Sequence, residues 1–175
     1  MLVEGISDQV ALEALARRRG RDLAAEGVSI VPIGGAQAIG RFLDRFAPFR
    51  LAGLCDAGEE RHFRRALERR GLGAELTRAD LESLGFYVCV DDLEDELIRA
   101  LGAASVEALL ESVGELASFR TMQKQPAWRG RPVEAQLRRF MGSSSLGKIE
   151  YARLLVGALD LAHVPRPLDG VLAHI

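Results

Sequence analysis

Four short apolar runs constrain the fold more than any other feature of the sequence. They occupy residues 2–3, 28–33, 51–55 and 86–90, and each is ended by an acidic residue or by glycine. A helical pattern of apolar residues follows each of the first three runs. Strands and helices that alternate at this spacing form right-handed parallel β-α-β units, with helices on both faces of the sheet. The sequence therefore predicts an α/β fold with a compact Rossmann-like core, built on a mainly parallel four-strand sheet flanked by helices.

Beyond Asp91 the apolar pattern is wholly helical. Helices are predicted at residues 93–101, 106–113, 133–140 and 149–161, and residues 123–132, with two prolines and three basic residues, are predicted to form an exposed loop. A chain of 175 residues has the usual size of one domain. We therefore expect an α/β core over residues 1–101 and a C-terminal helical appendage over residues 102–175, packed as a single compact unit.

The composition excludes several classes of protein. With 48% hydrophobic and 27% charged residues, the chain is neither disordered nor collagen-like. No stretch approaches the roughly 20 apolar residues that span a bilayer, and no basic leader opens the chain, so we expect a cytoplasmic protein without a membrane partner. Cys55 and Cys89 have apolar neighbours and no Cys-x-x-Cys spacing, which predicts buried free thiols.

The formal net charge of −2 conceals two regions of opposite charge. Residues 75–115 hold eleven acidic and two basic residues, a local charge of −9, whereas residues 120–153 hold eight basic and two acidic residues, a local charge of +6. Such asymmetry suits a protein that holds cations in one region and polyanions in the other, although solvated helix faces give the same counts.

Acidic residues recur at the predicted carboxyl edge of the sheet. Glu4, Asp56 and the pair Asp91 and Asp92 end predicted strands, and Asp8 lies in the first helical turn. Carboxylates that converge from distant parts of a chain repel one another unless a cation lies between them, and oxygen-only clusters select hard ions such as Mg²⁺ or Mn²⁺. Asp8 and Asp92 have a simpler explanation, since an acid at a helix N-terminus stabilises it by roughly 0.3–1 kcal/mol. That explanation does not extend to Glu4.

The sequence resembles the Toprim domain of the overcoming-lysogenization-defect (OLD) nucleases. The segments that carry the resemblance are 2–8 (Leu-Val-Glu-Gly-Ile-Ser-Asp), 31–35 (Val-Pro-Ile-Gly-Gly), 54–56 (Leu-Cys-Asp), 92–97 (Asp-Leu-Glu-Asp-Glu-Leu) and Gly147-Lys148 followed by 151–155. Together they extend over nearly the whole chain. In that family the glutamate that ends the first strand and an aspartate four residues later contribute to a metal site.

The resemblance implies metal-dependent hydrolysis of phosphodiester bonds in DNA. It implies two Mg²⁺ or Mn²⁺ ions, with metal ligands among Glu4, Asp8, Asp56, Glu59, Glu60, Asp92 and Glu94. Glu4 and Lys148 are the implied catalytic residues, and the lysine would neutralise charge on the transition state. A solvated lysine at the start of the last predicted helix is the simpler interpretation of Lys148. The family also joins its Toprim domain to an ATPase, so a separate ATPase subunit is an expected partner.

The sequence departs from the family pattern at the third strand. The family has Asp-x-Asp there, whereas this chain has Asp56-Ala57-Gly58-Glu59-Glu60, so Glu59 or Glu60 would have to replace the second aspartate. No intact phosphate-binding loop is present either. The segment from Gly142 to Lys148 satisfies Gly-x-x-x-x-Gly-Lys, but Ile149 replaces the hydroxyl residue that would bind magnesium, and no strong strand precedes it.

Basic side chains supply the candidates for contact with DNA. They are Arg61, Arg65, Lys124, Arg129, Arg131, Arg138 and Arg139. Pairing within the helix is the simpler interpretation of Arg61 and Arg65, because glutamates lie nearby in the sequence. The simpler interpretation of Trp128 is a loop anchor, and the alternative is stacking on an unpaired base. The three histidines lack the spacing of metal ligands.

Three functions are therefore compared. The first is an OLD-like, metal-dependent endonuclease. The alternative is a degenerate Toprim domain that binds nucleic acid or a partner protein without catalysis, and the altered Asp-x-Asp motif is what divides the two. A third interpretation, a phosphotransfer enzyme for small molecules, stays open because fold does not fix substrate.

Overall fold

A four-stranded parallel sheet lies at the centre of the α/β part of the protein. The computed structural model describes all residues, 1–175, and the strands are β1 (Leu2–Val3), β2 (Val31–Pro32), β3 (Gly53–Cys55) and β4 (Phe86–Val88). Their order is β2-β1-β3-β4, and every neighbouring pair is parallel. Leu2 pairs with Val31 on one side and with Gly53 on the other. The predicted four-strand parallel sheet is confirmed.

Alternate residues of the strands belong to two separate apolar cores. Leu2 and Cys55 belong to one cluster, whereas Val3 and Leu54 belong to the other. Successive side chains of a strand point to opposite faces of the sheet, so both faces of this sheet are covered by apolar residues. Cys55 and Cys89 are both buried free thiols, as predicted.

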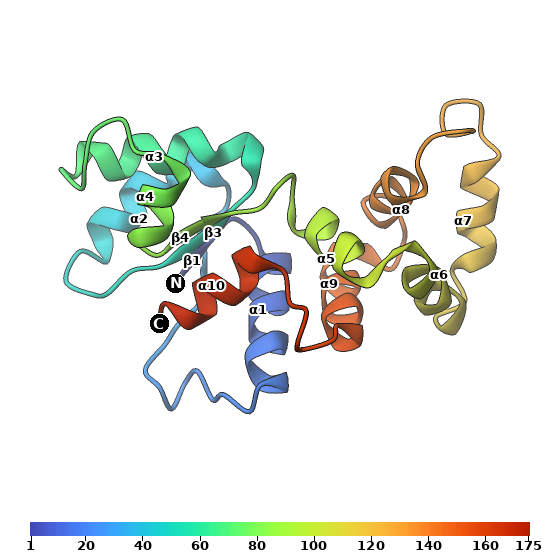
Figure 1. Ribbon diagram of the computed structural model, residues 1–175, viewed down its shortest axis with the longest axis horizontal. Helices are drawn as coiled ribbons and strands as arrows, with labels where there is room; N and C mark the ends of the chain where they lie inside the picture. The colour runs from blue at the N-terminus through green and yellow to red at the C-terminus, as the bar shows by residue number, and fades with distance from the viewer.

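Helices cover both faces of the sheet. The helices of the α/β part are α1 (Ile6–Arg18), α2 (Ile39–Arg45), α3 (Glu60–Arg69), α4 (Arg78–Ser83) and, from the end of the chain, α10 (Arg166–Ala173), with short 3-10 turns at Ala36–Ala38 and Ala57–Glu59. α2, α3 and α4 supply the residues of one apolar cluster, while α1 and α10 supply residues of the other. Figure 1 shows α2, α3 and α4 gathered on one side of the strands and α10 on the other.

A group of helices extends from this core. Its members are α5 (Leu93–Leu101), α6 (Ala103–Ser112), α7 (Leu116–Gln123), α8 (Val133–Met141) and α9 (Gly147–Ala158). α9 packs along α1, and α10 then returns to contact β3 and β4. In Figure 1, α6, α7 and α8 lie farthest from the sheet, with α5 and α9 between them and α1. The helical appendage is therefore present, and the boundary at residue 101 stays a prediction.

Several elements differ from the sequence prediction. The second strand is limited to Val31–Pro32, within the run 28–33, and the helix predicted at 149–161 ends at Ala158, because Leu159 has an extended backbone (φ −58°, ψ 141°). α4, α7 and α10 were not predicted. None of the helices is long and apolar enough to cross a membrane.

Candidate functional site

Glu4 and Asp56 lie side by side where neighbouring strands end. Glu4 follows β1 and Asp56 follows β3, and these strands are parallel partners. The backbone N–H of Asp56 donates to Oε1 of Glu4 at 2.8 Å. The carbonyl of Glu4 accepts the N–H groups of Gly34 and Gly35, both at 3.2 Å. Both glycines have positive φ (74° and 106°), which only glycine adopts readily, so the turn after β2 helps to fix Glu4 at this edge.

Asp8 lies in the first turn of α1 and faces the same edge. Its Oδ2 accepts the N–H of Gly5 at 2.8 Å, so the side chain does stabilise the helix N-terminus. Burial raises the pKa of Asp8 to about 6; the hydrogen bond from Gly5 opposes this shift, and the negative charge of Glu94 adds to it. Asp8 is thus a helix-capping residue and also a member of an acidic group.

Asp56 has the most strongly perturbed carboxylate of this edge. Burial, with the negative charges of Glu4, Asp8, Asp92 and Glu94 acting in the same direction, raises its pKa to about 8. Burial also raises the pKa of Glu4, against the effect of its hydrogen bond with Asp56. The charges of four other sequence-predicted residues therefore act on Asp56, at the carboxyl edge of the sheet.

Lys148 brings a positive charge to the acidic group. Its Nζ lies 3.1 Å from Oε1 of Glu94, whose side chain is 7% exposed. Burial by itself would lower the pKa of Lys148, but the charges of Glu94, Asp92 and Asp56, with the hydrogen bond to Glu94, raise it above its usual value. Lys148 comes from the first turn of α9 and Glu94 from the first turn of α5, so two helices distant in sequence meet here.

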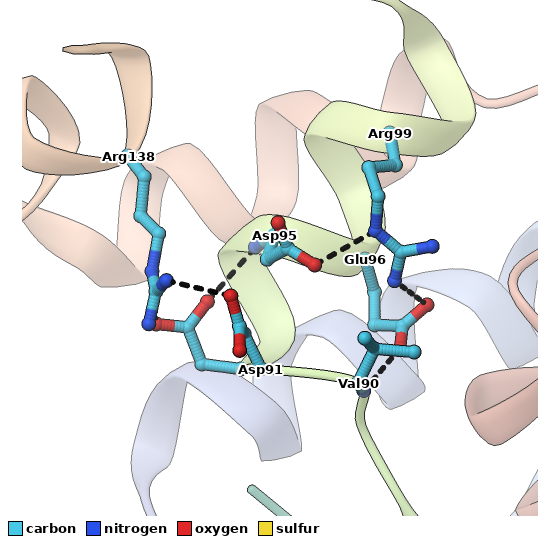
Figure 2. Close-up of polar contacts among 7 residues, drawn as sticks. Val90, Asp91, Asp95, Glu96, Arg99 and Arg138 are labelled. Carbon is cyan, nitrogen blue, oxygen red and sulfur yellow. Dashed lines mark hydrogen bonds and ion pairs between the residues drawn. The ribbon is translucent and has the colours of Figure 1, made fainter. Parts of the chain in front are cut away.

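Arg138 of α8 binds the acidic turn that precedes α5. Its Nε donates to Oδ2 of Asp92 at 2.7 Å, and its Nη1 lies 3.1 Å from Oδ2 of Asp91 (Figure 2). The other carboxylate oxygen of Asp92 accepts the N–H of Asp95 at 2.9 Å, which caps α5. A predicted metal ligand and a predicted DNA-binding residue are therefore paired with each other.

The remaining acids of α5 have structural partners. Glu96, which is 4% exposed, accepts the N–H of Val90 at 2.7 Å and pairs with Arg99 at 2.8 Å. Asp95 pairs with the same arginine at 2.7 Å. Figure 2 shows these contacts on the side of α5 away from Arg138. Glu96 thus fixes the connection from β4 to α5, which places Asp92 and Glu94 at the edge of the sheet.

Comparison with known proteins agrees with this arrangement. Residues 1–54 match the family model described as "Overcoming lysogenization defect protein-like, TOPRIM domain". The C-terminal region of the OLD protein of Burkholderia pseudomallei superposes with a TM-score of 0.73 at 18% identity, over 99% of this chain and 94% of that one. The chain carries a Toprim domain of the OLD type. The resemblance seen in the sequence is confirmed.

A second solved structure supports the same Toprim fold. The C-terminal region of the OLD protein of Xanthomonas campestris pv. campestris has a TM-score of 0.71 at 21% identity, over 99% of this chain and 91% of that one. No curated protein matches the sequence. The family model ends at Leu54, before Asp56, Glu94 and Lys148, so the roles of these three residues stay predictions.

The two glutamates after Asp56 lie in different surroundings in this Toprim domain. Glu60 is buried and pairs with Arg64 and with Arg78, the latter at 2.8 Å. Glu59 lies 3.5 Å from His62, and its charge adds to the forces that raise the pKa of Glu4. Glu59 therefore acts on the carboxylate of Glu4, whereas Glu60 is compensated by two arginines. Both remain predicted ligands.

The donor groups suit a hard divalent cation. They are carboxylate oxygens, and the pKa values of Glu4, Asp8 and Asp56 are all raised, as in a cluster whose negative charge is not fully compensated. Their present arrangement does not form a ready cage, since no group of three or more His, Cys, Asp and Glu side chains is placed to hold an ion. Glu94 and Asp92 are instead paired with Lys148 and Arg138. The chemistry of the site thus fits a metal ion, and binding would require these side chains to rearrange.

The basic residues predicted to contact DNA divide into two groups. Arg61 and Arg65 are exposed on α3 and make no hydrogen bond or ion pair, so the predicted pairing within that helix is absent. The others, Lys124, Arg129, Arg131, Arg138 and Arg139, belong to α8 and the loop before it. As predicted, this segment contains an exposed loop, which follows α7.

A cleft of about 370 Å³ joins the acidic and the basic parts of the site. Asp92 and Glu94 lie in its acidic wall, and Arg131, Arg138, Arg139, Lys148 and Trp128 are among its other residues. A larger hollow, of about 620 Å³, lies at the end of α1 and contains none of the predicted site residues. The position of Trp128 in this cleft keeps open the alternative interpretation of the sequence, stacking on an unpaired base.

Proposed function

We propose that this Toprim domain is a metal-dependent nuclease that hydrolyses phosphodiester bonds of DNA with Mg²⁺ or Mn²⁺. The observation that carries the proposal is the state of Asp56, whose pKa burial and four neighbouring carboxylates raise to about 8. A divalent cation bound among these carboxylates would favour their ionised forms and relieve their mutual repulsion. Glu4, Asp8, Asp56 and Glu94 are the proposed principal ligands, with Glu59, Glu60 and Asp92 as further candidates, and the complete site would hold two ions.

Residues of this chain would orient the DNA and move the proton. The hydrogen bond from the Asp56 N–H fixes the Glu4 carboxylate, and the raised pKa of Glu4 suits it to accept a proton. The raised pKa of Lys148 keeps its ammonium group charged at neutral pH, so it can stabilise negative charge on the phosphoryl oxygens. Divalent ions, when bound, would supply Lewis acidity toward the same oxygens.

Nicking of supercoiled plasmid in the presence of Mn²⁺ tests the proposal. We expect nicking by the wild-type chain and none above background in Glu4→Gln and Asp56→Asn, both of which keep the shape of the side chain. Equal nicking by all three proteins would show a contaminating nuclease and would overturn the assignment. The experiment should also include an ATPase as a separate partner, because the similar solved structures are C-terminal regions of OLD proteins and this sequence has no intact phosphate-binding loop.

One observation favours the alternative, a Toprim domain that binds without catalysis. Gly58 stands where the family has its second aspartate, and Lys148 and Arg138 already neutralise Glu94 and Asp92. A domain of this kind would bind DNA in a salt-dependent way but would show no metal-dependent turnover. Calorimetry with Mg²⁺ and Mn²⁺ at millimolar concentration separates the two functions, since only the nuclease requires the ions to bind.

A further inference from the structure

The cleft beside the acidic group has the size of a site for one small ligand. Its volume of about 370 Å³ is at the lower end of the roughly 300–1,000 Å³ found for pockets that bind small molecules. Its walls differ in chemistry, with Asp92 and Glu94 at one part and Trp128, Arg131 and Arg139 at another. A single nucleotide is of a size that fits such a space.

Trp128 is held as a rigid platform in this cleft. It is half-buried and packs against the larger apolar core. Its carbonyl accepts a hydrogen bond from Nε2 of Gln136, which is 5% exposed, at 2.8 Å. The guanidinium of Arg131 lies 5.2 Å from the centroid of the indole ring. An aromatic ring fixed in this way can stack on a nucleobase when the Arg131 guanidinium moves from the ring to the phosphate.

Two arginines of the cleft have donors free for a phosphate. Arg139 is exposed and makes no ion pair or side-chain hydrogen bond, in contrast to its neighbour Arg138, which is paired with Asp92. Arg131 donates its Nε to the carbonyl of Ala127 at 2.8 Å, and its terminal nitrogens have no hydrogen-bond partner. A planar guanidinium with free N–H groups suits a phosphate oxygen pair.

The charges in the cleft would orient a bound strand. Asp92 and Glu94 repel a phosphate, whereas Lys148, which contacts Glu94, attracts it. A nucleotide would therefore place its base at Trp128 and one phosphate at Arg139, and the next phosphate of the strand would approach Lys148 and the acidic group.

We propose that this cleft binds one unpaired nucleotide of a DNA strand, with its base stacked on Trp128 and its phosphate held by Arg139 and Arg131. The inference rests on the proposed nuclease function and makes it more specific: the preferred substrate has a single-stranded end or flap next to the bond that is cut. Continuous duplex lacks the unpaired base that the cleft accepts.

Fluorescence of the protein reports this contact directly, because Trp128 is the only tryptophan in the chain. The full chain is titrated with a short oligothymidylate in EDTA, so that binding is measured without any metal-dependent step. We expect quenching of the fluorescence and at least tenfold weaker binding to a blunt duplex. Arg139→Ala should weaken binding by about tenfold, whereas Arg17→Ala, which removes an equal exposed charge outside the cleft, should leave it unchanged.

Substitution of the ring completes the test. Trp128→Leu should weaken binding of a fluorescently labelled oligothymidylate by about tenfold, and Trp128→Phe should restore most of it, since phenylalanine also stacks. Circular dichroism melts check that Trp128→Leu is folded. If Trp128→Leu does not fold, the affinity of Trp128→Phe for the labelled oligothymidylate decides the result. Equal affinity for duplex and single strand, or no quenching, would overturn the inference. Nicking of plasmid without quenching of the Trp128 fluorescence would refute only the proposed nucleotide site in the cleft. Quenching without nicking would refute only the proposed nuclease activity.

Discussion

The N–H of Asp56 donates to Oε1 of Glu4, so the glutamate at the end of β1 is fixed by the residue that follows β3. Neither charge is removed by this contact, because a backbone amide, and not a basic side chain, is the donor. The pKa values of both carboxylates remain raised, with burial as the main cause. No basic side chain pairs with these two carboxylates, so without a cation the ionised form of each is disfavoured.

Glu4→Gln separates the structural role of this side chain from its charge. The amide oxygen can still accept the Asp56 N–H, so the variant should fold with an unchanged or slightly raised melting temperature in EDTA. In the wild type, Mn²⁺ should raise the melting temperature because it binds the folded acidic group and not the unfolded chain. Differential scanning fluorimetry should show most of that increase lost in Glu4→Gln. A full increase in the variant would exclude Glu4 as a ligand.

The stability of the metal-free protein should fall as the pH rises. The folded pKa of Asp56 is about 8 and that of Asp8 about 6, both above the unfolded value of 3.8. Between pH 4 and 8 the folded state then binds more protons than the unfolded state, so the free energy of unfolding decreases with increasing pH. Urea melts in EDTA from pH 5 to pH 8 should show this slope, and Asp56→Asn should reduce it.

Gly58→Asp should strengthen metal binding. It restores the second aspartate of the Asp-x-Asp motif, and a Cβ at this position would meet no atom within 4 Å. The added carboxylate should increase Mn²⁺ affinity by about tenfold, roughly 1.4 kcal/mol, in isothermal titration calorimetry. Gly58→Asn adds the same volume without the charge and is the matched control. An equal increase in both variants would show that charge at position 58 does not act on the ion.

Lys148→Ala should reduce cleavage much more than DNA binding. If the ammonium group stabilises the transition state, its loss should lower the nicking rate by about 100-fold or more, the order found for the removal of one such contact. Binding of uncleaved DNA should change by only a few fold. The variant also leaves the buried Glu94 without its partner, so Lys148→Ala/Glu94→Gln is the control for folding. Equal losses of binding and cleavage would make Lys148 a DNA-binding residue only.

The sequence predicted the elements whose patterns are local. α5 was placed at residues 93–101, where the structure has it, because the cap at Asp92 and the apolar spacing after it agree. α10 was not predicted from the sequence. Pro165 and Pro167 suggest a loop, although proline is also common in the first turn of a helix. The helix is stabilised by its contact with the sheet, which the local sequence does not indicate. The contact between α10 and the sheet joins residues far apart in the sequence, so no local periodic pattern predicts it.

The sequence predicted where acidic residues meet but not which basic residues pair with them. Strand ends located Glu4, Asp56 and Asp92 correctly at one edge, because parallel strands all end there. The ion pair between Arg138 and Asp92 joins residues 46 positions apart, and nothing in the local sequence indicates it. The sequence treated Arg138 and Arg139 as equivalent phosphate contacts, whereas only Arg139 has a free side chain in the structure.

Arg138 and Arg139 should therefore differ when each is replaced by alanine. Arg139→Ala removes an unpaired cation, so the slope of log affinity for DNA against log salt should fall by about one. Arg138→Ala removes a cation that Asp91 and Asp92 already neutralise, so the slope should stay nearly constant while the free energy of unfolding decreases by about 1 kcal/mol. Fluorescence anisotropy across a range of salt concentrations and urea melts measure the two effects. If Mn²⁺ binding displaces Arg138 from Asp92, Arg138 should contribute to the slope of log affinity against log salt only when Mn²⁺ is present. Equal changes of slope in both variants without metal would show that the pair opens freely when DNA binds.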